Sequence, residues 1–253
     1  WRCATGKLRP VAGALLAAWC AVFLWRVALP AARATTNGFA AYYTASHLLA
    51  HQPGSLRDAY DDAWFAARVE EAGIAGVHDI MNVQPPTMSL LVLPLAWLPP
   101  APARATWVAF SLLLLPAGLF LLARALALPD RWVLWAFPLC LLYAPVAENL
   151  RLGQGYAWLF FLLCLLYWSL LGGRPRVAGA ALGLMLVVKT AGAWLWPLLA
   201  WGRSWRAVLW GVLVAAGLAL ATLPWIGIEA WAAYASHLPN LATMPERTVT
   251  AYQ

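Results

Sequence analysis

Long apolar segments, separated by short loops that carry arginine, constrain the fold of this sequence more than any other feature. Several of the segments approach the length of about 20 apolar residues that a membrane-spanning helix needs. The chain is 63% hydrophobic and 11% charged, whereas an average soluble domain is about 25% charged. So few ions could not cover a soluble domain. The sequence therefore predicts an all-α polytopic membrane protein and excludes a soluble enzyme.

The basic residues do not form a nucleic-acid site, although the formal net charge is +7. They stand singly or in pairs between apolar runs, without a basic face that has interleaved aromatic residues. We therefore expect a lipid bilayer as partner and no nucleic acid. The four cysteines and four histidines fit no metal-ligand spacing, so the sequence predicts no metal site.

The apolar segments leave room for roughly seven or eight helical units. They cover residues 8–29, 107–122, 132–146, 156–171 and 207–224, with shorter pieces at 88–98, 177–188 and 191–201. Residues 1–253 are interpreted as a single transmembrane domain. Because the chain starts at Trp1 and stops inside a polar stretch, we expect it to be a fragment truncated at both ends.

Loop charges predict the orientation of the helices. Basic residues cluster in four places: Arg2, Lys7 and Arg9; Arg124 and Arg131; Arg174 and Arg176; Arg203 and Arg206. Since lysine and arginine in short loops favour the cytoplasmic side, residues 31–86 form a long extracytoplasmic loop that shares its face with residues 148–154. This scheme requires residues 88–98 to be re-entrant or partial.

Most acidic residues of the chain lie in or near that long loop. They are Asp58, Asp61, Asp62, Glu70, Glu71 and Asp79. Residues 39–50 and 62–72 have helical spacing and are expected to be amphipathic helices at the bilayer surface. A carboxylate held at the interface could act as a general base. The alternative is a solvated helix start, in which Asp61 or Asp62 caps the second helix.

Two further polar sites interrupt the apolar segments. Between two spans lie Glu148, Asn149, Arg151 and Gln154, where the guanidinium could bind phosphate and the amides could bind sugar hydroxyls. The alternative is an ordinary loop in which Glu148 and Arg151 pair at i,i+3 spacing. Lys189, one of only two lysines, could face a lipid phosphate or simply extend its ammonium group to the interface.

An ordered series of short motifs resembles a known family. The motifs are residues 37–46, 60–62, 84–86 running into 90–95, 152–154, 178–184 leading to Lys189, and 203–207. Together they cover nearly the whole chain and resemble the polyprenol-phosphate-mannose-dependent mannosyltransferases of glycosyltransferase family 87. The resemblance implies a GT-C fold, with many membrane helices and a long first extracytoplasmic loop that bears a catalytic Asp.

The resemblance also implies an activity. Such proteins transfer a mannose-like sugar, with inversion, from a polyprenyl-phosphate donor to a hydroxyl of a glycan or glycolipid acceptor. They work at the outer face of the bacterial inner membrane, with the lipid-phosphate sugar as substrate and no resident cofactor expected.

Site residues follow from the resemblance and the polar clusters together. Where the family usually has an Asp, this sequence has Gly38. The candidate catalytic acids are Asp61, Asp62, Asp58 and Glu148. The candidate substrate-binding residues are Lys189 and Arg151 for the phosphate, Gln154 and Asn149 for the sugar, and Tyr42, Tyr43 and Gln84.

Two other functions remain open from the sequence. A transporter or flippase of lipid-linked sugar would use the broken helices around residues 88–98 and Lys189 as a midplane site. A catalytically inactive scaffold homologue is suggested by Gly38.

Overall fold

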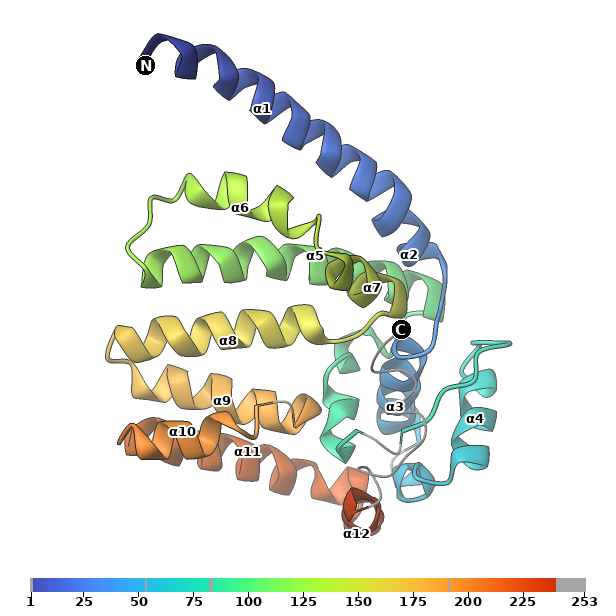
Figure 1. Cartoon of the computed structure of the whole chain (residues 1–253). Helices are drawn as coiled ribbons and strands as arrows, with labels where there is room; N and C mark the ends of the chain where they lie inside the picture. Colours follow the sequence, from blue (N-terminus) through green and yellow to red (C-terminus); the bar gives the residue numbers. More distant parts are fainter. Residues whose placement is uncertain (1, 53, 82–83, 191, 240–253) are drawn as a thin grey trace.

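All regular secondary structure in the described part of the chain is helical. A computed structural model describes residues 2–52, 54–81, 84–190 and 192–239, with side chains from Pro10 onward, and every regular element in these residues is a helix. The long helices α5, α8, α9 and α11 lie side by side, and shorter helices gather at one end of them (Figure 1). This confirms the predicted class, a polytopic helical membrane protein.

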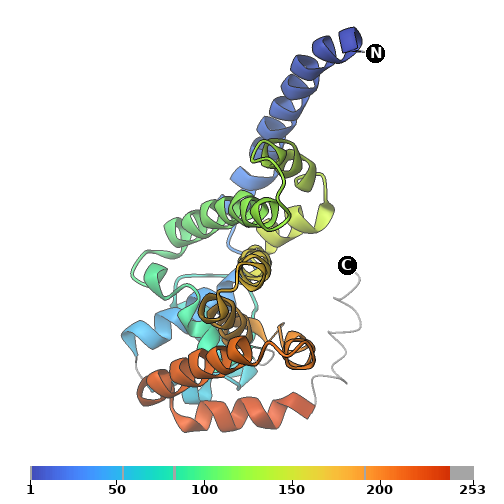
Figure 2. The same ribbon diagram turned by 90° about the vertical axis from the view of Figure 1, so that its left-hand side faces the viewer.

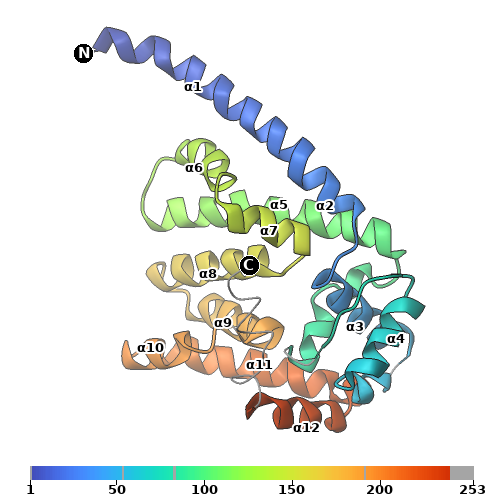
Figure 3. The ribbon, with the colours of Figure 1, turned by 45° about the vertical axis from the view of Figure 1, so that its right-hand side comes forward.

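The N-terminal helix packs against the other helices at its C-terminal end and leaves them towards its N-terminus (Figure 3). α1 (Arg2–Phe23), the π-turn η1 (Leu24–Ala28) and α2 (Leu29–Arg33) form one continuous helix that runs obliquely away from the other helices (Figure 3). Leu15 and Trp25 are among its exposed side chains. An apolar helix exposed in this way suits contact with lipid tails.

Fewer helices reach full membrane-spanning length than the sequence predicted. Among the described residues three qualify: Pro10–Arg33, α5 (Pro100–Ala125) and α11 (Trp205–Ile226). The pair α6 (Trp132–Cys140) and α7 (Ala144–Leu152), bent by 68°, makes up to four. The predicted seven or eight units counted shorter helices as well, namely α8 (Tyr156–Leu171), α9 (Pro175–Lys189) and α10 (Leu195–Trp201).

Close packing against α11 fixes the position of α9. An added Cβ atom would lie 2.5 Å from the Ala207 carbonyl oxygen at Gly179, and 2.7 Å from the Gly211 carbonyl oxygen at Gly183. Glycines four residues apart let two helix backbones approach in this way within a membrane. The end-on view shows the two helices as direct neighbours (Figure 2). This contact sets where the last residue of α9, Lys189, is presented.

The described residues between 34 and 98, here called the loop module, pack at one end of the long helices (Figure 1). The module contains α3 (Phe39–His51), η2 (Ser55–Asp58), α4 (Asp62–Glu71), η3 (Pro86–Leu90) and η4 (Leu93–Leu95), and α12 (Ile228–His237) packs against it. The two helices predicted in the loop agree with α3 and α4 within one residue at each end. Residues 88–98 form short 3₁₀ turns and no spanning helix.

The structure buries nearly all of α3, whereas the sequence predicted an amphipathic helix. Its residues from Phe39 to Leu49 are buried with the exception of His47, so α3 forms the centre of the loop module. The physical reason is that α4, η3 and η4 cover it, and the alanines on its faces let these neighbours approach closely. By contrast, α4 buries Phe65 and Val69 and exposes its acidic side chains.

Candidate active site

Lys189 lies at the centre of a polar cluster between the long helices and the loop module. Its Nζ atom donates hydrogen bonds to Gln154 Oε1 at 2.6 Å and to the Tyr42 hydroxyl at 3.1 Å. The same atom lies 4.3 Å from the ring centroid of Tyr156, a distance at which a ring attracts a cation. We call these four residues the lysine cluster.

Gln154 and Tyr42 are themselves linked. The Tyr42 hydroxyl also donates to Gln154 Oε1 at 3.0 Å, so the amide oxygen accepts from two donors. Among the described residues, no carboxylate oxygen lies within ion-pair distance of Lys189. A partly buried cation without an ion-paired anion is costly. The cluster is therefore suited to an anionic ligand.

Asp79 is a half-buried acid of the loop module that influences the lysine cluster. It interacts electrostatically with Lys189 and Tyr42. Its Oδ2 atom accepts hydrogen bonds from the backbone N–H groups of Gly38 at 2.5 Å and Ala41 at 2.8 Å. Asp79 thus caps the first turn of α3, where a negative charge is favoured, and faces the same region as Lys189.

Burial raises the pKa of Asp79 above its ordinary value. Removal from water disfavours the charged carboxylate, and the hydrogen bonds from Gly38, Ala41 and Ile80, together with the nearby His78, offset only part of that effect. A carboxylate with a raised pKa is a stronger base than an exposed one, which suits it to accept a proton from a hydroxyl group.

Arg104 fixes the turn that carries Gln154. Its side chain is fully buried in α5 and donates to four backbone carbonyls at the ends of α2 and α7, namely those of Ala31, Ala34, Leu150 and Arg151. Trp107 on the same helix donates to the Gly153 carbonyl at 2.9 Å. A cation at two helix C-termini is favourable. Arg104 and Trp107 therefore position the 152–155 turn.

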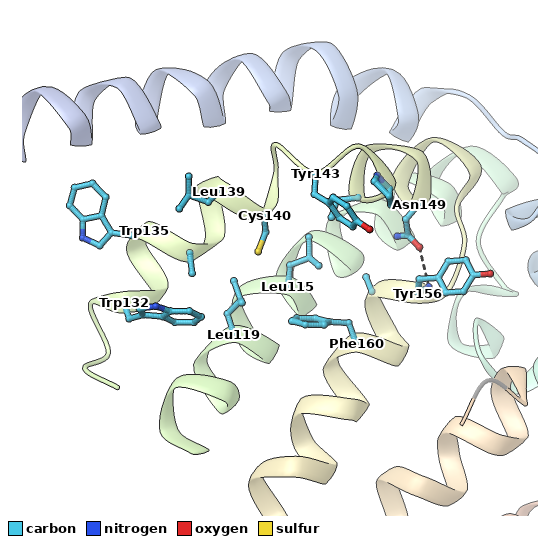
Figure 4. A pocket seen from close by; sticks show the side chains of 14 residues that line it. Leu115, Leu119, Trp132, Trp135, Leu139, Cys140, Tyr143, Asn149, Tyr156 and Phe160 are labelled. Atoms are coloured by element: carbon cyan, nitrogen blue, oxygen red, sulfur yellow. Dashed lines mark hydrogen bonds between the residues drawn. The ribbon is translucent and has the colours of Figure 1, made fainter. Parts of the chain in front are cut away.

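An apolar cavity of about 690 Å³ adjoins the lysine cluster. It lies between α5, α6, α7 and α8, with Trp132 and Trp135 at one end and Asn149 and Tyr156 at the other (Figure 4). Apart from Asn149 and the tyrosines, its lining is almost entirely apolar. Tyr156 is the member of the lysine cluster that lines the cavity, and its ring also contacts Lys189.

The four acids predicted as catalytic do not join this cluster. Asp61 is the N-cap of α4, where its side chain accepts from Trp64 N at 2.9 Å, and Asp62 stands exposed in the first turn. Asp58 is exposed beside Arg57. Glu148 is exposed and accepts from Arg151 at 2.6 Å, the helical pair that was one of the two alternatives.

The predicted binding residues divide into two groups. Lys189, Gln154 and Tyr42 come together as described, and Asn149 lines the nearby cavity while its side-chain oxygen accepts from Tyr156 N. Arg151, by contrast, is exposed and paired with Glu148.

Tyr43 and Gln84 are buried, and neither side chain forms a hydrogen bond with the lysine cluster in the described structure. The Tyr43 hydroxyl donates to the Leu98 carbonyl at 2.7 Å and its ring stacks on Phe39. The side-chain oxygen of Gln84 is buried without a hydrogen-bond partner in the described structure, while its carbonyl accepts from Tyr60.

Sequence reasoning named no site role for Asp79 or Arg104. Asp79 is an acid of the loop that stands directly before an apolar pair, Ile80 and Met81, whereas Asp61 and Asp62 stand next to each other. Arg104 is a lone charge in the first turns of an otherwise apolar helix. In both cases a charge in an apolar context was the available signal.

Gly38 has a conformation that a larger residue would disturb. Its φ is +91°, and a Cβ atom there would lie 2.5 Å from Gln154 Nε2 and 2.8 Å from the Leu152 carbonyl oxygen. An Asp side chain at this position, which the resemblance implied, would collide with Gln154. Asp79 instead brings a carboxylate to the backbone N–H of Gly38.

We expect Gly38→Ala to destabilise the protein by about 1–3 kcal/mol more than Gly54→Ala, the cost of overpacking. Gly54 is the matched control because its φ is +86° but nothing lies within 4 Å of an added Cβ atom. The measurement is the thermal unfolding of both variants in detergent. If Gly38→Ala and Gly54→Ala lose the same stability, Gln154 moves away from the added methyl group without an energetic cost.

Among the described residues, no three His, Cys, Asp or Glu side chains gather as a metal site. A family model described as glycosyltransferase family 87 matches residues 82–253. The match includes Gln154, Tyr156 and Lys189, whereas Tyr42 and Asp79 precede it. No curated protein and no solved structure is significantly similar to the chain.

Proposed function

Because the chain belongs to glycosyltransferase family 87 and is a membrane glycosyltransferase, we propose that it transfers a mannose-like sugar from a polyprenyl-phosphate donor to a hydroxyl of a glycan or glycolipid. The lysine cluster with Asp79 is the proposed active site. Under the positive-inside rule, this site faces the extracytoplasmic side of the membrane.

One observation carries the choice of donor: the apolar cavity ends at Tyr156, whose ring also contacts the Lys189 ammonium group. An isoprenoid chain is apolar over its whole length and carries its charge only at the phosphate. A cavity of this size has room for several isoprene units, and the Lys189 ammonium group, which lies against the Tyr156 ring, would attract a phosphate at this end. A free nucleotide-sugar has no long apolar chain to bury against such a lining.

Asp79 is the proposed general base. Its carboxylate takes the proton from the acceptor hydroxyl as that oxygen forms a bond to the anomeric carbon. The bond between the anomeric carbon and the phosphate oxygen breaks, and the electron pair leaves with the polyprenyl phosphate. A single displacement of this kind inverts the anomeric configuration.

Lys189 is the proposed stabiliser of the leaving phosphate. Negative charge grows on the phosphate as the bond breaks, so an ammonium group held in a site with little water favours the transition state. Gln154 and Tyr42 hold that ammonium group in place. Asn149, at the same end of the cavity, has amide N–H groups with which to orient the donor.

A transfer assay tests this function. The full-length protein is reconstituted into vesicles that contain polyprenyl-phosphate mannose radiolabelled in the sugar, together with a glycolipid extract as acceptor. We expect the label to leave the polyprenyl lipid and appear on the acceptor. Label that crosses the bilayer while still attached to the polyprenyl lipid would instead identify a flippase, and no movement of label would identify the inactive scaffold.

Filling the cavity should weaken binding of a long-chain donor. Ala136, which is buried in the cavity wall, is replaced by Trp. We expect the KM for a long polyprenyl donor to rise about tenfold, which corresponds to the loss of roughly two buried CH₂ groups, with little change in kcat. The KM for a donor of one or two isoprene units should stay the same.

The matched control for this variant is Leu134→Trp, on the same helix. Leu134 is 73% exposed and does not line the cavity, so the KM should stay near the wild-type value. If Ala136→Trp leaves the KM for the long-chain donor unchanged, the isoprenoid chain of the donor does not bind in this cavity.

A further inference from the structure

A second pocket lies at the opposite end of the long helices from Lys189. It has a volume of about 410 Å³ and is formed by the turn after α8 and the turn after α10. The 15 residues of α9 separate it from Lys189, which at 1.5 Å per residue is about 22 Å. It is therefore distinct from the proposed active site and does not depend on the function proposed for that site.

Three arginines line this pocket: Arg174, Arg203 and Arg206. Among the described residues, no carboxylate lies within ion-pair distance of any of the three guanidinium groups. Arg174 is held by stacking on Trp168, with the guanidinium carbon 4.0 Å from the ring centroid. We call this site the arginine pocket. Three unpaired guanidinium groups around one hollow attract an anion.

The two turns of the arginine pocket have the same backbone structure. Gly173 closes the first turn with φ +63°, and the N–H of Arg174 bonds to the Ser169 carbonyl at 2.8 Å. Arg203 occupies the corresponding place in the second turn with φ +56°, followed by a 2.9 Å bond from Ser204 N to the Leu199 carbonyl.

Arg203 thus adopts a left-handed conformation in a place where glycine is the favoured residue. A residue with a long side chain is less stable than glycine in this conformation. The turn after α8 has glycine at the corresponding position, Gly173. The side chain of Arg203 adds a third positive charge to the pocket, which is what a site for an anion requires.

Two helix N-termini and two exposed tryptophans near the arginine pocket also favour an anionic ligand at the level of the lipid headgroups. α9 and α11 both begin at the pocket, so their N-terminal N–H groups, which favour anions, lie near the three arginines. Trp201 and Trp205 are 91% and 61% exposed. Exposed tryptophans are typical of the level of the lipid headgroups.

We propose that the arginine pocket binds the phosphate of an anionic phospholipid headgroup. By the positive-inside rule this end of the helices faces the cytoplasm, so the lipid comes from the leaflet opposite the proposed active site. Arginine is suited to this ligand because its planar guanidinium group donates two parallel hydrogen bonds to phosphate oxygens. Basic pockets between membrane helices on this side recognise anionic headgroups.

The test is lipid binding to the full-length protein in detergent, measured by native mass spectrometry with phosphatidylglycerol and, separately, phosphatidylcholine. We expect the wild type to retain phosphatidylglycerol preferentially. Arg203→Gly and Arg206→Ala should each lower its affinity about fivefold, the contribution of one basic residue. Arg203→Gly is the sharper variant because glycine suits the turn, so the fold is kept.

Arg131→Ala is the matched control. Arg131 is an exposed arginine in another basic loop and does not line the arginine pocket, so phosphatidylglycerol binding should stay unchanged. Equal binding by the wild type, Arg203→Gly and Arg206→Ala would overturn the proposal, as would an equal loss in Arg131→Ala. Inorganic phosphate that displaces phosphatidylglycerol completely at equal concentration would show that the pocket takes free phosphate, and would overturn the lipid assignment.

Discussion

Asp79→Asn should lower the rate of sugar transfer by about 10²–10⁴-fold, the usual contribution of a general base. The amide cannot accept the proton of the acceptor hydroxyl. Its oxygen can still accept hydrogen bonds from the N–H groups of Gly38 and Ala41, which the Asp79 carboxylate accepts in the wild type. The cap of α3 is therefore kept, and the loss is expected in kcat with the fold intact.

Asp61→Asn is the matched control. Asp61 also caps a helix with its side-chain oxygen, so both variants replace a capping carboxylate by a capping amide. If Asp79 is the base, Asp61→Asn keeps transfer within a few-fold of the wild type. A large loss in Asp61→Asn, together with full activity of Asp79→Asn, would return the role to one of the acids that the sequence favoured: Asp61, Asp62, Asp58 or Glu148.

The pH profile is a second readout for Asp79. Since burial raises its pKa, the carboxylate becomes protonated at a higher pH than an exposed Asp, whose pKa is about 3.9. The base works when deprotonated, so transfer should decline as the pH falls through the raised pKa. The same shift means that the charged carboxylate disfavours folding at neutral pH, so Asp79→Asn should not lower the thermal unfolding midpoint there.

Local patterns were enough to predict the helices of the loop and to single out some residues of the proposed site. The spacing of Phe39, Tyr42 and Tyr43 predicted α3, and the pair Asp61 and Asp62 predicted the start of α4, because each signal acts within one or two helical turns. Lys189 stood out because a charged side chain in an apolar run is costly unless it has a partner, and Gln154 stood out as part of the polar stretch between two apolar segments.

Contacts made over long stretches of sequence were not predictable. Asp79 accepts a hydrogen bond from the N–H of Gly38, the N-cap of α3, which lies 41 residues earlier in the chain. Such a cap leaves no local motif. Arg104 binds carbonyls from residues on both sides of it, at separations of 73 and 46 positions. The burial of α3 likewise depends on the segments that cover it, and its composition alone does not distinguish a core helix from a surface helix.

Lys189→Met should lower kcat/KM by about 10²–10³-fold, as expected when one charge-stabilising donor is removed from an active site. Methionine has a similar length and no charge, and the hydrogen bond between Tyr42 and Gln154 at 3.0 Å remains to hold the turn. Because the variant removes a partly buried cation, the unfolding midpoint should stay the same or rise. The loss should therefore appear in transfer, measured with radiolabelled donor.

Arg151→Met is the matched control, because Arg151 was the other candidate for the phosphate. It is exposed and paired with Glu148, and exposed pairs contribute little. We expect a change in kcat/KM of no more than a few-fold. If Arg151→Met loses activity to the same extent as Lys189→Met, the phosphate lies outside the lysine cluster.

The double variant Asp79→Asn with Lys189→Met tests whether the two residues act in the same step. Asp79 and Lys189 interact electrostatically, and in the proposed reaction one removes the proton while the other stabilises the leaving phosphate. Groups that act on one transition state are not additive, so the double variant should lose much less than the product of the two single losses. A loss of activity equal to the product of the two single losses would mean that Asp79 and Lys189 contribute to separate steps. The single displacement proposed here would then be wrong.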